Sequence, residues 1–191
     1  EIIKLLQDEP FFAALSRRVD KKPGNIPTAG VRINPDTCAY EMIYNPQFFD
    51  GLTDEQRKGV LIHEFYHLVF DHVGGRRPDG VNHMAWNIAT DLAINSLITE
   101  QGSRLERLPE GEGQGQGEGG EQGDQQGSGS GNGNFDDHSG WEENSNSAAT
   151  DIAKQKMKEA VRKAAEEAAS GRGFGSAGGQ AKKLILDSLK T

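Results

Sequence analysis

An apolar run at residues 60–70 dominates the middle of the chain and is long enough to form a buried helix. The segment opens on Thr53, with Gln56 three positions later, which is a capping box. Gly74 stops the pattern, because glycine commonly ends a helix. We therefore expect one long helix over residues 53–73.

Residues 84–98 show a second helical pattern, in which polar side chains interrupt an otherwise apolar sequence. These polar residues, Asn87, Asp91 and Asn95, are spaced four apart and so lie on one stripe of the helix. Polar side chains on so apolar a helix require polar partners. The sequence therefore predicts a second helix whose polar stripe faces another polar group.

The flanking segments predict the remaining architecture. Residues 2–19 carry apolar side chains around an internal Pro10, which indicates one kinked helix or two short ones. Residues 29–33 and 38–44 alternate and are separated by an Asn-Pro-Asp-Thr turn signal, so they predict a hairpin. A third long helix is expected at about residues 150–169. We expect this helix to dock on the core through the side that carries Ile152, Met157, Val161, Ala164 and Ala168.

The first long helix contains the string His63-Glu64-Phe65-Tyr66-His67, which has the pattern H-E-x-x-H. Residues four apart lie on one helix face, so both imidazoles can reach a single ion. Glu64 projects about 100° round from His63, which suits a carboxylate that reaches a metal-bound water. Zinc lowers the pKa of such a water, and Glu64 can take its proton and pass it to a leaving amine. The motif predicts zinc-dependent peptide hydrolysis with Glu64 as the general base.

A catalytic zinc site needs a third protein ligand besides the two histidines. We favour Asp91, because it places an anionic oxygen on the polar stripe of the second helix. His72 lies five residues beyond His67 and faces away from the pair on a continuous helix. His83, just before the second helix, and His138 are the remaining alternatives.

Four further residues have candidate supporting roles. Asn87 and Asn95 would hydrogen-bond the histidine ligands and hold each in one tautomer. His138 or Tyr66 would donate a hydrogen bond to the oxyanion that forms during hydrolysis.

Several strings give the chain a resemblance to a known family. These strings are, in this order, residues 45–49, 61–72 and 86–95, together with 137–141. Through them the chain is similar to the putative metallopeptidase domain of bacterial and phage proteins that often carry a C-terminal VWA-like domain. The resemblance covers most of the chain and implies a zincin-like fold and peptidase activity, without a particular substrate. The chain ends at Thr191 without room for a VWA-like domain, so we expect the metal-ion-dependent adhesion function of that part to be absent or to have been removed.

A low-complexity segment divides the chain. Residues 110–134 are almost wholly Gly, Gln, Glu, Ser and Asn, too polar to offset the entropy of ordering. We expect a disordered insertion at residues 109–135 between a zincin-like core at 1–108 and a C-terminal helical part at 136–191 that packs on this core. The expected fold class is α+β, with a small N-terminal sheet or hairpin and extra C-terminal helices.

Charge and composition restrict the partners. The net charge of −8 argues against binding to nucleic acid or an anionic membrane. The single Cys38 excludes an internal disulfide and a cysteine-based zinc site, which fits a reducing compartment. No stretch approaches the roughly 20 apolar residues of a membrane span. We expect a cytoplasmic protein that acts on a peptide or protein.

Together these features predict a metal-dependent hydrolase of the zinc metallopeptidase class. The alternative is a catalytically inactive, zinc-stabilised scaffold that binds a protein or peptide without cutting it. The two differ at the metal, because structural zinc sites are usually closed by a fourth protein ligand whereas catalytic sites stay open.

Overall fold

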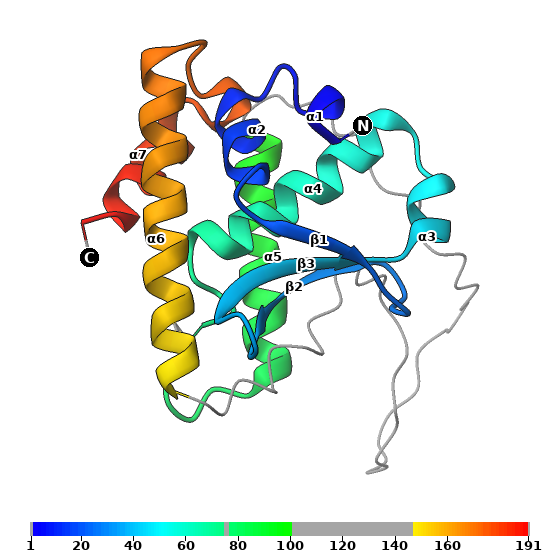
Figure 1. Cartoon of the computed structure of the whole chain (residues 1–191), viewed down its shortest axis with the longest axis vertical. Coiled ribbons are helices and arrows are strands. Elements are labelled where there is room, and N and C mark those ends of the chain that lie inside the picture. The colour runs from blue at the N-terminus through cyan, green and yellow to red at the C-terminus, as the bar shows by residue number, and fades with distance from the viewer. Residues whose placement is uncertain (1, 75–76, 101–146, 191) are drawn as a thin grey trace, which may run out of the picture.

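The computed structural model describes residues 2–74, 77–100 and 147–190, and has an α+β architecture (Figure 1). The strands are β1 (Asp20–Pro23), β2 (Ala29–Asn34) and β3 (Ala39–Tyr44). The helices are α1 (Ile2–Leu5), α2 (Pro10–Ser16), α3 (Pro46–Asp50), α4 (Asp54–Val69), α5 (His83–Glu100), α6 (Ser147–Ser170) and α7 (Gly179–Ser188). The predicted insertion at residues 109–135 lies outside the described residues.

The three strands form one sheet in the order β1-β3-β2. β2 and β3 pair antiparallel, with Val31 opposite Met42, so the predicted hairpin is confirmed. The Asn34 side chain closes its turn by accepting hydrogen bonds from the backbone N–H groups of Asp36 (2.9 Å) and Thr37 (3.2 Å). β1 pairs parallel to β3 and has no counterpart in the sequence prediction, because a short polar strand that ends in Pro23 carries no alternation.

Helices cover the sheet and share one hydrophobic core with it. Figure 1 shows α5 passing behind the three strands, α4 crossing above them in this view, and α6 running along one side. Phe65 and Tyr66 of α4 are fully buried and contact Phe12 of α2, with ring centroids 6.4 Å and 5.1 Å away. Val31 and Met42 belong to the same core, as do Ala164 and Ala168 of α6. The α6 helix therefore packs on the same core as the strands.

One residue of the predicted docking side of α6 lies elsewhere. Ile152 is 46% exposed, whereas Met157, Val161, Ala164 and Ala168 are buried as expected. Ala149 and Ala153 take the inward positions on this first part of the helix instead. Small side chains there allow α6 to approach β3 closely.

The N-terminal segment forms two short helices, which is one of the two predicted outcomes. Pro10 occupies the first turn of α2, where its missing N–H costs no hydrogen bond. The buried Glu9 just before it accepts hydrogen bonds from the backbone N–H (2.7 Å) and hydroxyl (2.6 Å) of Ser176. Lys58 Nζ of α4 lies 3.5 Å from the same carboxylate. These contacts tie α2 to α4 and to the segment before α7.

The α4 helix begins as predicted and ends earlier than predicted. Thr53 is the N-cap, and the capping box with Gln56 is present. The last helical residue is Val69, and Asp71 has a φ of 53°, so the expected continuation to Val73 is wrong. Asp71 tolerates this left-handed conformation better than an apolar residue would. The chain therefore turns sharply four residues after His67.

Tertiary contacts hold this turn in place. The Tyr40 hydroxyl donates a hydrogen bond to Asp71 Oδ1 (2.9 Å), and Lys154 Nζ lies 3.8 Å from Asp71 Oδ2. Burial, the charge of Asp71 and this hydrogen bond raise the pKa of Tyr40, so its hydroxyl remains a donor. A Cβ on Gly74 would lie 2.3 Å from Asp71 Oδ1 and 2.5 Å from the Tyr40 hydroxyl, so a larger residue there would push this hydrogen-bonded pair apart. No helix within the described ranges is long and apolar enough to cross a membrane.

Candidate metal centre

The α4 helix places His63 and His67 side by side, one turn apart. Their Nε2 atoms lie 3.0 Å from each other. His67 is completely buried, and the side chain of His63 is 15% exposed. Both rings therefore present the same nitrogen to one point at the edge of the core.

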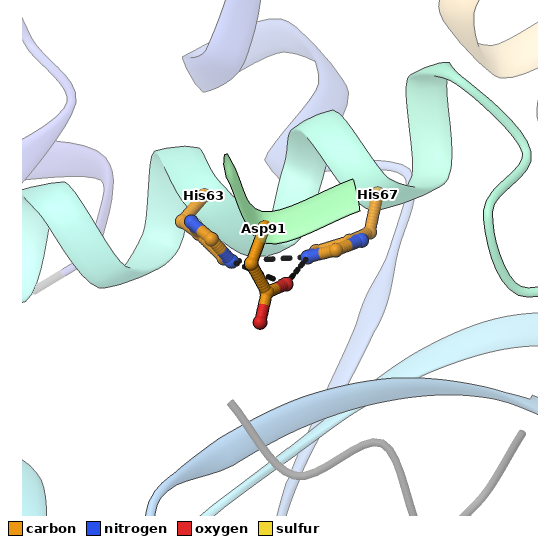
Figure 2. Close-up of side chains that lie close together, drawn as sticks. All are labelled: His63, His67 and Asp91. Atoms are coloured by element: carbon orange, nitrogen blue, oxygen red, sulfur yellow. Dashed lines mark hydrogen bonds and ion pairs between the residues drawn. The ribbon is translucent and has the colours of Figure 1, made fainter. Parts of the chain in front are cut away.

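Asp91 approaches this point from α5 (Figure 2). Its Oδ1 lies 3.2 Å from Nε2 of His67 and 3.5 Å from Nε2 of His63. The helix is oriented by Ile94, which is buried in the core one turn along from Asp91. Burying this apolar side turns the carboxylate towards α4. The structure thus brings together the two histidines of the motif and the aspartate of the polar stripe.

The three side chains fit a metal ion. Their ligand atoms lie 3.0, 3.2 and 3.5 Å from one another. A tetrahedral zinc ion with bonds of about 2.0–2.1 Å has neighbouring ligand atoms about 3.3–3.4 Å apart. Two imidazole nitrogens and one carboxylate oxygen also form a donor set known for catalytic zinc. Among the described residues, His63, His67 and Asp91 form such a group.

A second residue of the polar stripe contacts the pair. Asn95 Oδ1 lies 3.2 Å from Nδ1 of His63. In this orientation the amide oxygen can only accept, so Nδ1 of His63 carries the proton and donates it. Nε2 of the neutral ring then keeps its lone pair, which points towards Asp91 and His67.

The third residue of the stripe lies elsewhere. Asn87 is buried (8% exposed), and its Nδ2 lies 3.2 Å from Nδ1 of His83 on the first turn of α5. Asn87 therefore donates to His83 and not to a histidine of the motif. His83 is likewise outside the group of ligand atoms that converge on one point.

The position of His72 corrects the prediction that it faces away from the pair. Its Nδ1 lies 3.1 Å from Nδ1 of His67. The prediction assumed a continuous helix, whereas α4 ends at Val69 and the left-handed Asp71 turns the chain back. His72 therefore contacts the second ring nitrogen of His67, Nδ1, whereas Nε2 faces His63 and Asp91.

The remaining candidate residues differ in their surroundings. Glu64 follows His63 on α4 and is 1% exposed. Tyr66 is fully buried in the core, where its ring stacks on Phe70 (5.6 Å) and meets Phe12 edge-on. His138 lies outside the described residues.

The fold and the site define a class of protein: an α+β domain with an H-E-x-x-H helix and a two-histidine, one-aspartate group suited to a metal ion. The family model "Putative metallopeptidase domain" matches residues 2–109, more than half of the 191 residues. The chain belongs to this family, which confirms the resemblance to a putative metallopeptidase domain over residues 2–109. No curated protein and no solved structure matches the chain.

Proposed function

We propose that the chain is a zinc metallopeptidase of zincin-like type, in which His63, His67 and Asp91 hold the ion. The observation that carries this proposal is the convergence of two Nε2 atoms and one carboxylate oxygen within 3.5 Å of one another. The family to which the chain belongs supports metallopeptidase activity in general. The substrate that we propose is a peptide or protein.

The ligand count supports catalysis over a purely structural metal. When bound, zinc supplies Lewis acidity, which polarises a carbonyl and lowers the pKa of water towards neutrality. Among the described residues, three side chains lie close enough together to hold one ion. Catalytic zinc sites use three protein ligands, whereas structural sites use four. A scaffold of the structural type needs a fourth protein ligand.

Glu64 is the general base of the proposed reaction. It is adjacent to His63 on α4, and its carboxylate is shielded from bulk water at 1% exposure. A carboxylate in this position takes a proton from the attacking water and returns it to the leaving amine. A buried carboxylate is also held in few rotamers, which favours proton transfer over a short distance.

Asn95 supports the site by orienting His63. Its Oδ1 accepts the proton of Nδ1 at 3.2 Å, which fixes the ring and the tautomer that binds metal through Nε2. Asn95 therefore acts through His63 and does not touch the ion.

The test combines metal analysis with peptide hydrolysis. The purified chain should hold about one zinc per molecule, and His63→Ala should remove it. Glu64→Gln keeps the shape of the side chain and both imidazoles, so zinc should remain while hydrolysis of a fluorogenic peptide library falls by about 10²–10⁴-fold.

The Glu64→Gln result separates catalysis from metal binding. Zinc at full occupancy in a His63→Ala/His67→Ala double variant would contradict the metal site. Unchanged turnover in Glu64→Gln would remove Glu64 as the base, while the metal site would stand. Stoichiometric zinc without cleavage of any peptide in the library would contradict peptidase activity.

A further inference from the structure

His72 makes a contact with the metal site that the H-E-x-x-H motif does not include. Its Nδ1 lies 3.1 Å from Nδ1 of His67, a hydrogen-bond distance between two ring nitrogens. One nitrogen of such a pair must donate and the other must accept. The direction of this hydrogen bond therefore decides which nitrogen of His67 carries a proton.

The surroundings of His67 determine that direction. Nε2 of His67 lies 3.0 Å from Nε2 of His63 and 3.2 Å from Asp91 Oδ1, on the side where the ligand atoms converge. A histidine binds metal through an unprotonated nitrogen. In the metal-binding form the single proton of neutral His67 is on Nδ1, and His67 donates it to His72. His72 is the acceptor.

The fold holds His72 in position through its backbone. The N–H of His72 donates to the carbonyl of His67 (3.0 Å), and the indole N–H of Trp86 donates to the carbonyl of His72 (3.2 Å). The Trp86 ring also meets the His72 imidazole edge-on, with centroids 5.8 Å apart. His72 is thus fixed to α4 on one side and to α5 on the other.

The turn that brings His72 back is itself fixed from a distant part of the chain. Asp71 adopts a left-handed φ of 53°, and its carboxylate accepts a hydrogen bond from Tyr40 of β3. Without this turn, a residue five positions after His67 would point to a different side of α4. The sheet therefore contributes to the position of His72.

We propose that His72 is a positioning residue that holds His67 in the Nδ1-protonated tautomer and fixes its ring, so that Nε2 presents its lone pair to the metal. This inference rests on the proposed metal site and deepens it. His63 receives the same support from a different group, the amide oxygen of Asn95. Each imidazole ligand would then have its own hydrogen-bond acceptor.

Two substitutions of His72 separate its hydrogen bond from its packing. His72→Leu removes the acceptor, and we expect zinc affinity to fall about 10–100-fold, the usual cost of losing such a partner. His72→Asn places a side-chain oxygen where Nδ1 stood, so it should keep zinc affinity within a few-fold of the unaltered chain. His83→Leu is the matched control, because His83 contacts Asn87 and lies outside the ligand group. Its zinc affinity should be unchanged.

The primary measurement is zinc affinity of the full chain, by competition with a chelator of known affinity. Circular dichroism and thermal unfolding of each metal-free variant establish that its fold is kept. The second measurement is nuclear magnetic resonance of the unaltered, zinc-loaded chain with ¹⁵N-labelled histidine. We expect a coupling across the hydrogen bond between Nδ1 of His67 and Nδ1 of His72, with the proton on His67.

Each result decides the inference. Unaltered zinc affinity in His72→Leu, or an equal loss in His72→Leu and His72→Asn, would overturn the positioning role while leaving the metal site intact. A proton on Nε2 of zinc-loaded His67, or a second zinc bound between His67 and His72, would overturn it as well. Absence of zinc binding by the unaltered chain would refute both the proposed function and this inference. Zinc binding with the predicted variant ranking but without peptide cleavage would support the positioning role and refute only the peptidase activity.

Discussion

Replacement of Asp91 by alanine tests the third ligand directly. The substitution removes the one anionic oxygen of the group and leaves His63 and His67, whose Nε2 atoms are 3.0 Å apart. Four-ligand zinc sites in small domains bind with about 10–16 kcal/mol, which is about 2.5–4 kcal/mol per ligand. At about 1.4 kcal/mol per tenfold change, loss of one ligand should weaken zinc binding by about 10²–10³-fold.

Two variants control for general effects of substitution on α5. Asp91→Asn keeps the shape and one oxygen but loses the charge, so its zinc affinity should lie between those of the unaltered chain and Asp91→Ala. Asn87→Ala alters a buried polar residue one turn earlier, which bonds His83 and not a ligand. We expect Asn87→Ala to keep zinc affinity within a few-fold, even if it lowers the melting temperature.

The assay is a zinc titration against a chelator, with the melting temperature of each metal-free variant recorded in parallel. We expect the unaltered chain and Asn87→Ala to bind zinc most tightly, Asp91→Asn more weakly and Asp91→Ala most weakly. Equal zinc affinity for Asp91→Ala and the unaltered chain would refute Asp91 as a ligand. An Asn87→Ala variant as weak as Asp91→Ala would show that the loss comes from a disturbed helix and not from the missing oxygen.

Two further predictions concern stability. Gly74→Ala should lower the free energy of unfolding by about 1–3 kcal/mol in denaturant titration, because its Cβ would overlap Asp71 Oδ1 and the Tyr40 hydroxyl. Gly51→Ala is the control and should be neutral or stabilising, because the nearest atom is 3.5 Å away and φ is −79°. Equal losses of stability in the two variants would contradict the role of the turn. Burial alone would raise the pKa of Glu41, but hydrogen bonds from Lys22, Asn34 and Arg32 outweigh it and hold this pKa below its ordinary value of 4.5. As pH falls, the unfolded chain therefore takes up the proton first, and the unaltered chain should lose stability below about pH 4.5 more steeply than Glu41→Gln. Parallel profiles of stability against pH for the two proteins would contradict this prediction.

Features set by short stretches of sequence were predictable. The capping box of Thr53 and Gln56 fixed the start of α4, because its two hydrogen bonds join residues only three apart. The hairpin of β2 and β3 followed from alternation and a turn signal between the strands. The proximity of His63 and His67 required only that the motif be helical.

Features set by distant contacts were not predictable in the same way. The sequence from Leu68 to Val73 continues the apolar pattern, yet α4 stops at Val69. The reason is the Asp71 turn, which depends on Tyr40, 31 residues earlier in the chain. The β1 strand depends in the same way on its pairing with β3, because its own polar sequence has little strand propensity.

The early end of α4 has a consequence for the site itself. A helix continued to Val73 would have carried His72 away from His67, and the buried His67 would have required another acceptor for Nδ1. Ending the helix at Val69 leaves most hydrogen bonds of that turn in place, because the backbone N–H groups of Phe70, Asp71 and His72 still donate to the carbonyls of Tyr66, Leu68 and His67. The turn gains a hydrogen bond from Tyr40 to Asp71, one from Trp86 to His72 and the contact between His72 and His67. The residues that terminate the motif helix are therefore the same residues that support one of its two histidines, which explains why a pattern of apolar positions alone could not locate either feature.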